Sequence, residues 1–418
     1  MKVLLVSTAE RTGGGAIAAR RLLTALNQSG VSATMVVRDK QTDLQEVIPL
    51  NHKRLGLLKF AWERFVIWCN NLFSLKNLFK VSIANTGFDI TRLPVFQEAD
   101  IIHLHWVNQG MLSLGDIERI LRSGKPVVWT MHDMWQCTSI CHYSYDCDRF
   151  HSECKQCHFL RFPGEHDLAN RVFRKKKKLF QGHIIHIATV SRWLERQVQQ
   201  SAILGHCPTC VIPNTLPLTE FKILDKAECR KRLGLPLERK IILFGAARVD
   251  DPIKGFGTVL AAIAEFIRQK PEYRHRLHLV TFGTYKQKKP DFPIEHTAIG
   301  WIKDNTTLSV LYSAADIALS ASLYETFGQT LIESQACGCI PVSFGNSGQS
   351  DIIRHKENGY IADYLSVASL AEGIYWGLTE GEKISGEKLR EEVVQRYSAE
   401  AVAGQYRSLY EKLVADKS

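Results

Sequence analysis

The stretch "ADIALSASLYETFGQTLIESQACGCIPVSF" (residues 315–344) decides the fold. It begins with a short apolar run, passes through a Gly-containing turn into a helical pattern, and ends in a second apolar run, "IPVSF". A strand, a helix and a strand in this order predict a parallel βαβ unit, since parallel strands need a crossover connection. Glu325 and Glu333 lie beyond the first strand, where such sheets bind their ligands.

The same alternation of strands and helices runs along the rest of the chain. The first half contains apolar runs such as "KVLLVST" and "PVVWTMHD", and the second half restarts with "KIILFGAAR" and "LHLVTFG". Amphipathic segments such as "GFGTVLAAIAEFIRQ" separate these runs. The pattern predicts an α/β protein with two doubly wound, Rossmann-like domains that face each other across a cleft.

A mid-chain segment separates the two halves. "CVIPNTLPLTEF" (210–221) contains two prolines and little helical pattern, which indicates a linker. We therefore predict a first domain over 1–212, a linker over 213–222 and a second domain over 223–397. A last helix within 398–418 is expected to pack back on the first domain.

Composition favours a large globular protein of the cytoplasm. The chain has 418 residues, of which 45% are hydrophobic and 23% are charged, so it can bury a large core. No apolar run approaches the ~20 residues that span a bilayer, and the start does not resemble a signal peptide. The net charge of +10 favours phosphorylated ligands, anionic lipid or nucleic acid as partners. Part of it lies in "RKKKK" (174–178), for which a solvated helix face is the simplest explanation.

A basic and aromatic segment covers residues 52–80. Its apolar residues fall near one face of a helix. A helix lying on a membrane surface, close to a lipid-linked acceptor, would have this pattern. Ordinary core packing explains it equally well. The residues concerned are Leu55, Leu58, Trp62, Phe65, Val66, Cys69 and Phe73.

Two cations follow the first strand of the second half. Arg248 and Lys254 stand six positions apart, and together they could neutralise a diphosphate. Two solvated loop charges would give the same spacing. In the first half, Gly14 and Gly15 open a helix directly after a strand, which suits an anion or a sugar hydroxyl, although a tight turn alone explains them as well.

The segment "ETFGQTLIE" (325–333) combines backbone donors with carboxylates. The N–H groups of Thr326, Phe327 and Gly328 are expected to point at an anion in front of the following helix. Glu325 and Glu333 could accept hydrogen bonds from hydroxyl groups. The segment therefore suits a ligand with both phosphate and polyol groups, although carboxylates near a helix start also arise without a function.

A cysteine-rich loop occupies residues 137–158. Cys154 and Cys157 have the spacing of half a zinc site, whereas Cys141 and Cys147 are more widely spaced than usual. Four thiolates from one loop could bind a structural zinc ion. Reduced loop thiols or cystines are the alternatives.

Together these motifs resemble those of the retaining GT-B glycosyltransferases of family 4. The resemblance covers nearly the whole chain and rests on the two glutamates, the Arg-x5-Lys loop, "YSAADIALSAS", "ACGCIPV" and the N-terminal Gly turn. The first half is similar to the branch typified by colanic-acid and capsule biosynthesis enzymes, through "ADIIHLHWVNQGMLSL", "PVVWTMHDMWQCTSICHYSYDC", "CKQC" and "TVSRWL".

The resemblance implies a role for individual residues. Glu333 would bind the ribose hydroxyls of a nucleotide sugar, and Glu325 would hold hydroxyls of the transferred sugar. Arg248 and Lys254 would bind the diphosphate. From the first half, the Gly14–Gly15 turn would approach the diphosphate. His132 would contact the donor sugar at the reaction centre, although a histidine at a strand end is more often structural.

Two positions depart from the pattern of these enzymes. Thr138-Ser139-Ile140 stands where the branch usually has Thr-Gly-Gly, which leaves the acceptor open. Pro213-Asn214-Thr215 replaces a frequent Pro-Asn-Gly and affects only a turn. The Asp146-Cys147-Asp148 motif lies inside the cysteine loop, so we interpret it as unrelated to metal-dependent sugar transfer.

The sequence thus predicts a retaining glycosyltransferase that moves a sugar from a nucleotide-sugar donor to a surface-polysaccharide, lipid-linked acceptor. The resemblance implies catalysis without a metal, and the only cofactor predicted is the structural zinc. We expect a cytoplasmic enzyme at the inner face of the membrane, with peripheral membrane association and no nucleic-acid partner. The alternatives are a zinc-containing nucleic-acid-binding protein and an epimerase of the same fold.

Overall fold

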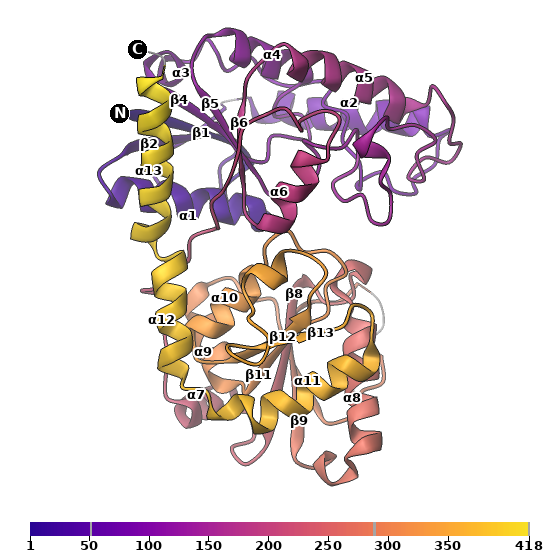
Figure 1. Cartoon of the computed structure of the whole chain (residues 1–418), viewed down its shortest axis with the longest axis vertical. Helices are drawn as coiled ribbons and strands as arrows, with labels where there is room; N and C mark the ends of the chain where they lie inside the picture. The colour runs from indigo at the N-terminus through magenta and orange to yellow at the C-terminus, as the bar shows by residue number, and fades with distance from the viewer. Residues whose placement is uncertain (51, 287–289, 417–418) are drawn as a thin grey trace. The chain divides into compact units, whose positions relative to one another are not determined.

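The computed structural model describes residues 1–50, 52–286 and 290–416. By their internal contacts these residues form two compact units (Figure 1). The first unit comprises Met1–Thr215 and the end of the chain from Val402, and the second comprises Leu216–Ala401. Each unit is built on its own parallel sheet, which confirms the predicted fold class of two doubly wound α/β domains.

The first unit contains a seven-stranded sheet in the order β3-β2-β1-β4-β5-β6-β7. The central strands β1, β4, β5 and β6 are almost entirely buried because helices cover the sheet, whereas the edge strands β3 and β7 are half-buried. The strands are β1 (Lys2–Ala9), β2 (Ser32–Asp39), β3 (Val47–Pro49), β4 (Ile101–Leu104), β5 (Val127–Met131), β6 (His186–Thr189) and β7 (Thr209–Val211). The helices are α1 (Gly14–Gln28), α2 (Lys53–Asn70), α3 (Pro94–Glu98), α4 (Leu114–Arg122), η1 (Arg149–His151), α5 (Leu168–Gln181), α6 (Arg192–Gln199) and α13 (Ala399–Ala415).

The second unit contains a six-stranded sheet in the order β10-β9-β8-β11-β12-β13. Figure 1 shows α7, α9 and α10 on one face of this sheet and α8 and α11 on the other. The strands are β8 (Lys240–Arg248), β9 (Leu277–Thr284), β10 (His296–Gly300), β11 (Ile317–Ser320), β12 (Ile340–Phe344) and β13 (Tyr360–Ala362). The α-helices are α7 (Lys226–Leu233), α8 (Phe256–Gln269), α9 (Asn305–Ala314), α10 (Gln329–Ala336), α11 (Val367–Thr379) and α12 (Gly386–Tyr397), and the short 3-10 helices are η2 (Pro252–Lys254), η3 (Pro271–Tyr273), η4 (Gly348–Asp351) and η5 (Gly381–Lys383).

Each sheet has one point where the strand order reverses. In the first unit the chain builds outward from β1 to β3 and then returns to place β4 on the other side of β1. In the second unit β11 pairs with β8 on the side opposite β9. Loops that leave two adjacent strands in opposite directions open a crevice at their carboxyl ends, and ligands of open α/β sheets bind there. The candidate sites are therefore expected beyond β1 and β4, and beyond β8 and β11.

The C-terminal helix completes the first unit. The Tyr410 hydroxyl lies 2.6 Å from Nδ1 of His103 on β4, and the Tyr406 hydroxyl lies 2.7 Å from Oγ1 of Thr130 on β5. Both tyrosines are buried, so α13 contributes to the core of this unit. Hydroxyl groups buried in pairs with strand residues fix the helix in one position on the sheet, because a shift would leave them unsatisfied.

A second, smaller core lies beneath the cysteine loop. Ile67 of α2 packs there with Val81, Ile140 and Val172. The basic run 174–178 on α5 is only partly solvated, because Lys176 is fully buried with its ammonium over the Trp135 ring. The solvated-face interpretation is wrong for Lys176, which donates to the carbonyls of Trp135 and Thr138.

Within the described residues, the helices are too short or too polar to cross a membrane.

Candidate active site

The loop after β8 carries the first pair of expected residues. Asp251 caps η2 through a hydrogen bond from the Ile253 N–H, and η2 ends at Lys254. Gly255 follows with φ of +68°, and a Cβ there would meet the Ala321 carbonyl oxygen at 2.0 Å. Only glycine fits this approach, which brings the loop after β8 against the loop after β11.

Lys254 and Glu325 meet at this junction. Lys254 Nζ lies 2.8 Å from Glu325 Oε2, and both side chains are partly buried. Burial opposes the charge of Lys254, but the attraction of Glu325 and its hydrogen bond outweigh it and raise the Lys254 pKa. Lys254 is therefore a fixed cation at pH 7, held at the carboxyl end of the sheet.

Arg248 is balanced by its own loop. Its guanidinium lies 3.0 Å from Asp251 Oδ2 and 3.5 Å from Asp250 Oδ1, and its side chain is one-third exposed. An anionic ligand would have to compete with these carboxylates for Arg248. The sequence analysis did not identify Asp250 and Asp251 as partners of Arg248, although they stand two and three positions after it.

The segment 325–328 is held by the loop after β12. The Glu325 N–H donates to Ser347 Oγ at 3.1 Å, and the Gly348 N–H donates to the Glu325 carbonyl at 2.8 Å. A Cβ at Gly348 would lie 2.3 Å from the Thr326 carbonyl oxygen, so the two loops are in backbone contact. Thr326 and Phe327 are buried in this contact. Sequence reasoning missed Ser347 and Gly348, because their role depends on a neighbouring strand's loop.

Glu333 lies one helical turn inside α10. Gly328, with φ of +111°, forms the N-cap of this helix. Glu333 is buried, and its Oε2 accepts a hydrogen bond from the Tyr312 hydroxyl at 3.3 Å. Burial raises the Tyr312 pKa well above its usual value, and the neighbouring Glu333 charge adds to the effect. Tyr312 is thus a neutral donor that orients the carboxylate.

In the first unit, the Gly turn and His132 are in direct contact. Gly13 has φ of +92° and caps α1. A Cβ at Gly15 would lie 3.0 Å from Cβ and Cγ of His132, whereas one at Gly14 would meet nothing within 4 Å. The sequence placed these residues in one site through a family resemblance, and the structure brings Gly15 and His132 together.

His132 is partly buried and belongs to a row of histidines. Its Nε2 lies 3.0 Å from Nδ1 of His105, which directly follows β4. The ring centroid of His105 lies 4.2 Å from that of His103, which belongs to β4. Burial lowers the pKa of His132 to about 4 and that of His103 to about 3. These imidazoles are neutral at pH 7. His105 was not identified from the sequence, where "HLHW" is an ordinary buried strand end.

Asp133, next to His132, forms a second polar cluster. Its Oδ2 accepts hydrogen bonds from Trp106 Nε1 at 2.8 Å and from His142 Nδ1 at 2.7 Å. Burial acts to raise the Asp133 pKa, but His142 and the other hydrogen bonds outweigh it, so the pKa is lowered. The carboxylate therefore stays ionised and fixes the loop that follows His132.

The cysteine loop gathers the four expected ligands in one region. Burial raises the pKa of the thiols of Cys141, Cys154 and Cys157 to about 12, and the charges of neighbouring cysteines add to this effect, including Cys147 in each case. Among residues 1–50, 52–286 and 290–416, no group of three or more His, Cys, Asp or Glu side chains is arranged to hold a metal ion. All the cysteines are free thiols.

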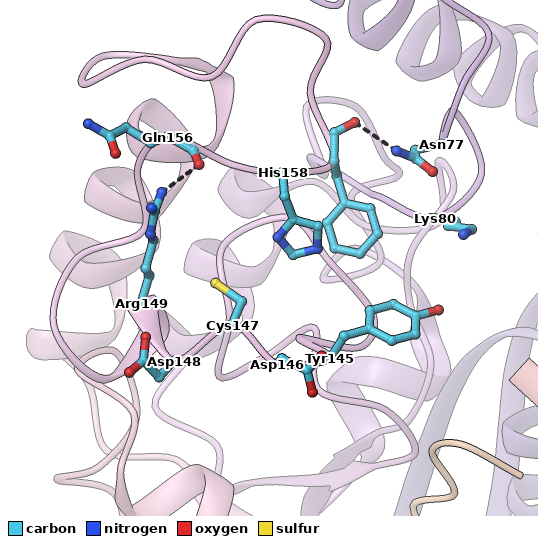
Figure 2. Close-up of a pocket in the computed structure, with 10 residues that line it drawn as sticks. Asn77, Lys80, Tyr145, Asp146, Cys147, Asp148, Arg149, Gln156 and His158 are labelled. Atoms are coloured by element: carbon cyan, nitrogen blue, oxygen red, sulfur yellow. Dashed lines mark hydrogen bonds between the residues drawn. The ribbon is translucent and has the colours of Figure 1, made fainter. Parts of the chain in front are cut away.

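A hollow of about 640 Å³ opens beside this loop (Figure 2). Arg149 forms one wall, bound to the main-chain carbonyl of Gln156, and Asn77 donates to the Phe159 carbonyl on the other. The Asp146 and Asp148 side chains line it, and none of the lining residues is one of those expected to bind the donor. That the Asp-Cys-Asp motif is unrelated to sugar transfer stays a prediction.

The expected site residues thus form two groups, one in each unit. Lys254 contacts Glu325, Arg248 lies at the end of the neighbouring strand, and Glu333 follows on α10. Gly15 contacts His132. The group in the second unit follows β8 and β11, where the strand order reverses. In the first unit Gly15 follows β1 at the reversal point, whereas His132 follows β5, one strand beyond β4.

Comparison with solved structures identifies the fold. Sucrose-phosphate synthase from Thermosynechococcus elongatus matches with a TM-score of 0.67 at 20% identity, covering 99% of both chains. HepE from Anabaena, solved with UDP and glucose, matches with a TM-score of 0.63 at 15% identity, covering 99% of this chain and 100% of that one. These likenesses show the GT-B fold.

Among curated proteins, a D-inositol 3-phosphate glycosyltransferase from Thermobispora bispora is 28% identical over 65% of this chain. The match spans only 62% of that relative's own length. A glycosyltransferase of Methanocaldococcus jannaschii is 24% identical over 80% of this chain and 90% of its own length. These relatives do not single out the colanic-acid and capsule branch.

Two family models divide the chain between them. Residues 12–220 match the model described as Glycosyltransferase Family 4, and residues 225–396 match the model described as Glycosyl transferases group 1. The first match alone covers half of the chain. The chain therefore belongs to the GT-B glycosyltransferases of family 4, with a group 1 domain in its second half.

Proposed function

We propose that this glycosyltransferase uses a nucleotide-sugar donor, retains the anomeric configuration and needs no catalytic metal. The observation that carries the proposal is the contact between Lys254 and Glu325, with Glu333 on the following helix, at the reversal point of the second sheet. A fixed cation suits the diphosphate, and the two carboxylates suit sugar and ribose hydroxyls. Arg248 would turn from Asp251 to the diphosphate when the donor binds.

The chemistry asked of these residues is modest. The bond between the anomeric carbon and the diphosphate oxygen breaks, and a bond to the acceptor oxygen forms on the same face. The acceptor proton passes to the departing phosphate oxygen. Lys254 and Arg248 stabilise the charge that develops on this phosphate, as preorganised donors do in a closed site. They take the role that a metal ion plays in other transferases.

His132 is the proposed contact of the first unit with the donor sugar. As a neutral imidazole whose Nε2 faces His105, it is suited to hydrogen bonding and not to carrying charge. The Gly14–Gly15 turn is the proposed point of approach to the diphosphate. Gly15 leaves His132 the room that a side chain would take.

There are two candidate acceptors. The family resemblance of the motifs favours a surface polysaccharide on a lipid carrier, at the inner face of the cytoplasmic membrane. The names of several curated relatives favour a phosphorylated inositol. An acceptor panel containing both, with the product's anomeric configuration read by proton NMR, decides between them. An inverted product would overturn the retaining mechanism.

The donor is tested by thermal shift with nucleoside diphosphates and nucleotide sugars. A ligand at ~100 times its Kd adds about 2.7 kcal/mol to the free energy of unfolding. Stabilisation by one nucleoside diphosphate supports the proposal. Stabilisation by oligonucleotides alone would instead favour a nucleic-acid-binding protein. Turnover that persists in a chelator tests the absence of a catalytic metal.

We also propose a structural zinc held by Cys141, Cys147, Cys154 and Cys157. The support is that the four thiols come from one loop and that neighbouring cysteines influence one another's pKa. Because no group among the described residues is arranged to hold a metal ion, zinc binding would require these side chains to turn toward the ion. About one equivalent of zinc in the purified reduced protein supports the site, and no zinc with four titratable loop thiols excludes it.

A further inference from the structure

Helix α2 turns an apolar face away from the core of its unit. The side chains of Leu58, Trp62 and Phe65 are 66%, 54% and 48% exposed. A helix on the surface of a globular protein normally buries such a face and exposes its polar one. The exposed apolar face is therefore a candidate surface for a binding partner.

The stripe is a continuous helical face. At ~100° per residue, Leu55, Leu58, Trp62 and Phe65 fall within about 80° of one another. The residues of α2 that are buried fall on the other side of the helix, which packs on the smaller core through Ile67. The two explanations of the 52–80 pattern are thus separated: the apolar stripe is not part of the core.

The apolar surface continues beyond the helix. Ring centroids follow one another from Trp62 to Phe65 at 5.8 Å, from Phe65 to Trp68 at 6.0 Å, and from Trp68 to Phe73 at 4.7 Å. Phe79 stacks on Phe60, at 6.4 Å, on the side of α2 that carries its buried residues, and so does not belong to this surface. We call the α2 surface the exposed set Leu55, Leu58, Trp62, Phe65, Leu72, Phe73 and Leu75.

The charges around the α2 surface have one sign. Glu63 is the only acidic residue between 52 and 80, and it is buried beside Arg64, accepting hydrogen bonds from backbone N–H groups of the next segment. The exposed charges of the segment are all basic, namely Lys53, Arg54, Lys76 and Lys80. Exposed Trp, Phe and Leu side chains with basic residues before and after them in the segment are typical of helices that lie in a membrane interface.

We propose that the α2 surface docks this chain on an anionic membrane, with α2 in the plane of the lipid headgroups. The charge of the segment favours a membrane over a second copy of the chain. A second copy would bring the same basic residues close and repel them, whereas anionic lipid would neutralise them. The proposal gives a physical basis to the membrane location proposed above, but it rests on the α2 surface and does not depend on the transfer reaction.

Vesicle sedimentation of the full chain tests the apolar part. The wild-type protein is expected to bind vesicles of phosphatidylcholine with one-third phosphatidylglycerol, and to bind pure phosphatidylcholine at least about tenfold more weakly. The double variant Trp62→Ser/Phe65→Ser is expected to lose most of the binding. The matched control is Trp301→Ser, because Trp301 is 56% exposed on the second unit. That variant is expected to bind as wild type.

A second variant tests the charges. Each basic residue near an anionic surface contributes about fivefold to binding, so Lys53→Gln/Arg54→Gln/Lys76→Gln should weaken it by about 100-fold. Raising the salt to 0.5 M should weaken the wild type in the same direction. All variants change exposed side chains, and an unchanged melting temperature with retained nucleoside diphosphate binding shows that the fold and the donor site are intact.

Equal binding of wild type and the Trp62/Phe65 variant to anionic vesicles would overturn the proposal. A wild-type protein that ignores vesicles but forms a dimer dissolved by Trp62→Ser/Phe65→Ser would show that a second copy is the occupant instead. Failure of donor turnover with normal vesicle binding would affect only the proposed function.

Discussion

The two units differ in the charge of the residues that are expected to bind the donor. In the second unit, Lys254 and Glu325 form an ion pair at the edge of the sheet, and Arg248 is paired with Asp251. In the first unit, His105 is buried and His132 is partly buried, and the lowered pKa values of both keep them neutral. The same topology of parallel strands thus supports charged candidate residues in one unit and neutral imidazoles in the other. The difference suits a division of labour, in which one unit binds a diphosphate and the other contacts uncharged sugar.

Removing the fixed cation should have the largest effect. Lys254→Ala is expected to lower kcat/KM for the donor by about 10²–10³-fold, because a preorganised charge at the leaving group is lost. Lys240→Ala is the matched control, since Lys240 pairs with Glu382 on an exposed part of the same unit. If kcat/KM of Lys254→Ala stayed within about threefold of wild type, Lys254 would have no part in stabilising the leaving group.

Substitution of the two glutamates should affect different ligands. Glu333→Gln is expected to weaken nucleoside diphosphate binding about tenfold, since a charge-assisted hydrogen bond to the ribose is lost. Glu325→Gln should leave that binding within about twofold and lower donor turnover instead, because this residue is proposed to face the sugar. Titration calorimetry and steady-state kinetics on both variants measure this. Identical profiles would make the two carboxylates structural.

The contact between Gly15 and His132 allows the candidate residues of the first unit to be tested. Gly15→Ala would place a Cβ 3.0 Å from His132 and displace the imidazole, so kcat/KM is expected to fall about tenfold. Gly404→Ala on α13 is the control, because a Cβ there meets nothing within 4 Å. Wild-type kinetics in Gly15→Ala would show that the exact position of His132 does not matter for turnover.

The smallest expected effect concerns stability in acid. The folded pKa values of His103 and His132 are depressed, to about 3 and about 4, below the ordinary value of 6.5. The unfolded chain therefore binds more protons between pH 6.5 and 4, and stability falls as the pH drops through this window. His103→Gln should remove about 1 kcal/mol of the loss between pH 7 and 5.5. Denaturant unfolding at both pH values measures it, and an unchanged slope would contradict the neutral, buried state of His103.

Local pattern was sufficient for much of the fold. The apolar runs "KVLLVST" and "PVVWTMHD" contain the strands β1 and β5, and the Gly turn before Gln329 starts α10 as expected. Such features follow from the periodicity of neighbouring residues and the conformational freedom of glycine, which a sequence displays directly. The predictions that failed concern burial. The sequence suggests that Lys176 is one of five surface charges, yet its side chain is buried and its ammonium lies over the Trp135 ring.

For the candidate site, the sequence provided residue types and their place after strands, and the family resemblance provided their roles. It did not provide partners. Ser347, which receives the Glu325 N–H, and Asp251, which pairs with Arg248, belong to loops whose proximity depends on strand order. His105 beside His132 depends on the pairing of β4 with β5.

The sequence by itself determined the alternation of strands and helices, the two α/β halves and the residues able to bind phosphate and polyol, because these follow from local periodicity and side-chain chemistry. The tertiary structure alone decided which charges are neutralised and which apolar residues are left uncovered. Trp62 and Ile67 are both apolar residues of α2, yet one is exposed and the other buried. The physical reason is that a helix has two sides, and only packing with distant segments selects the one that is removed from water.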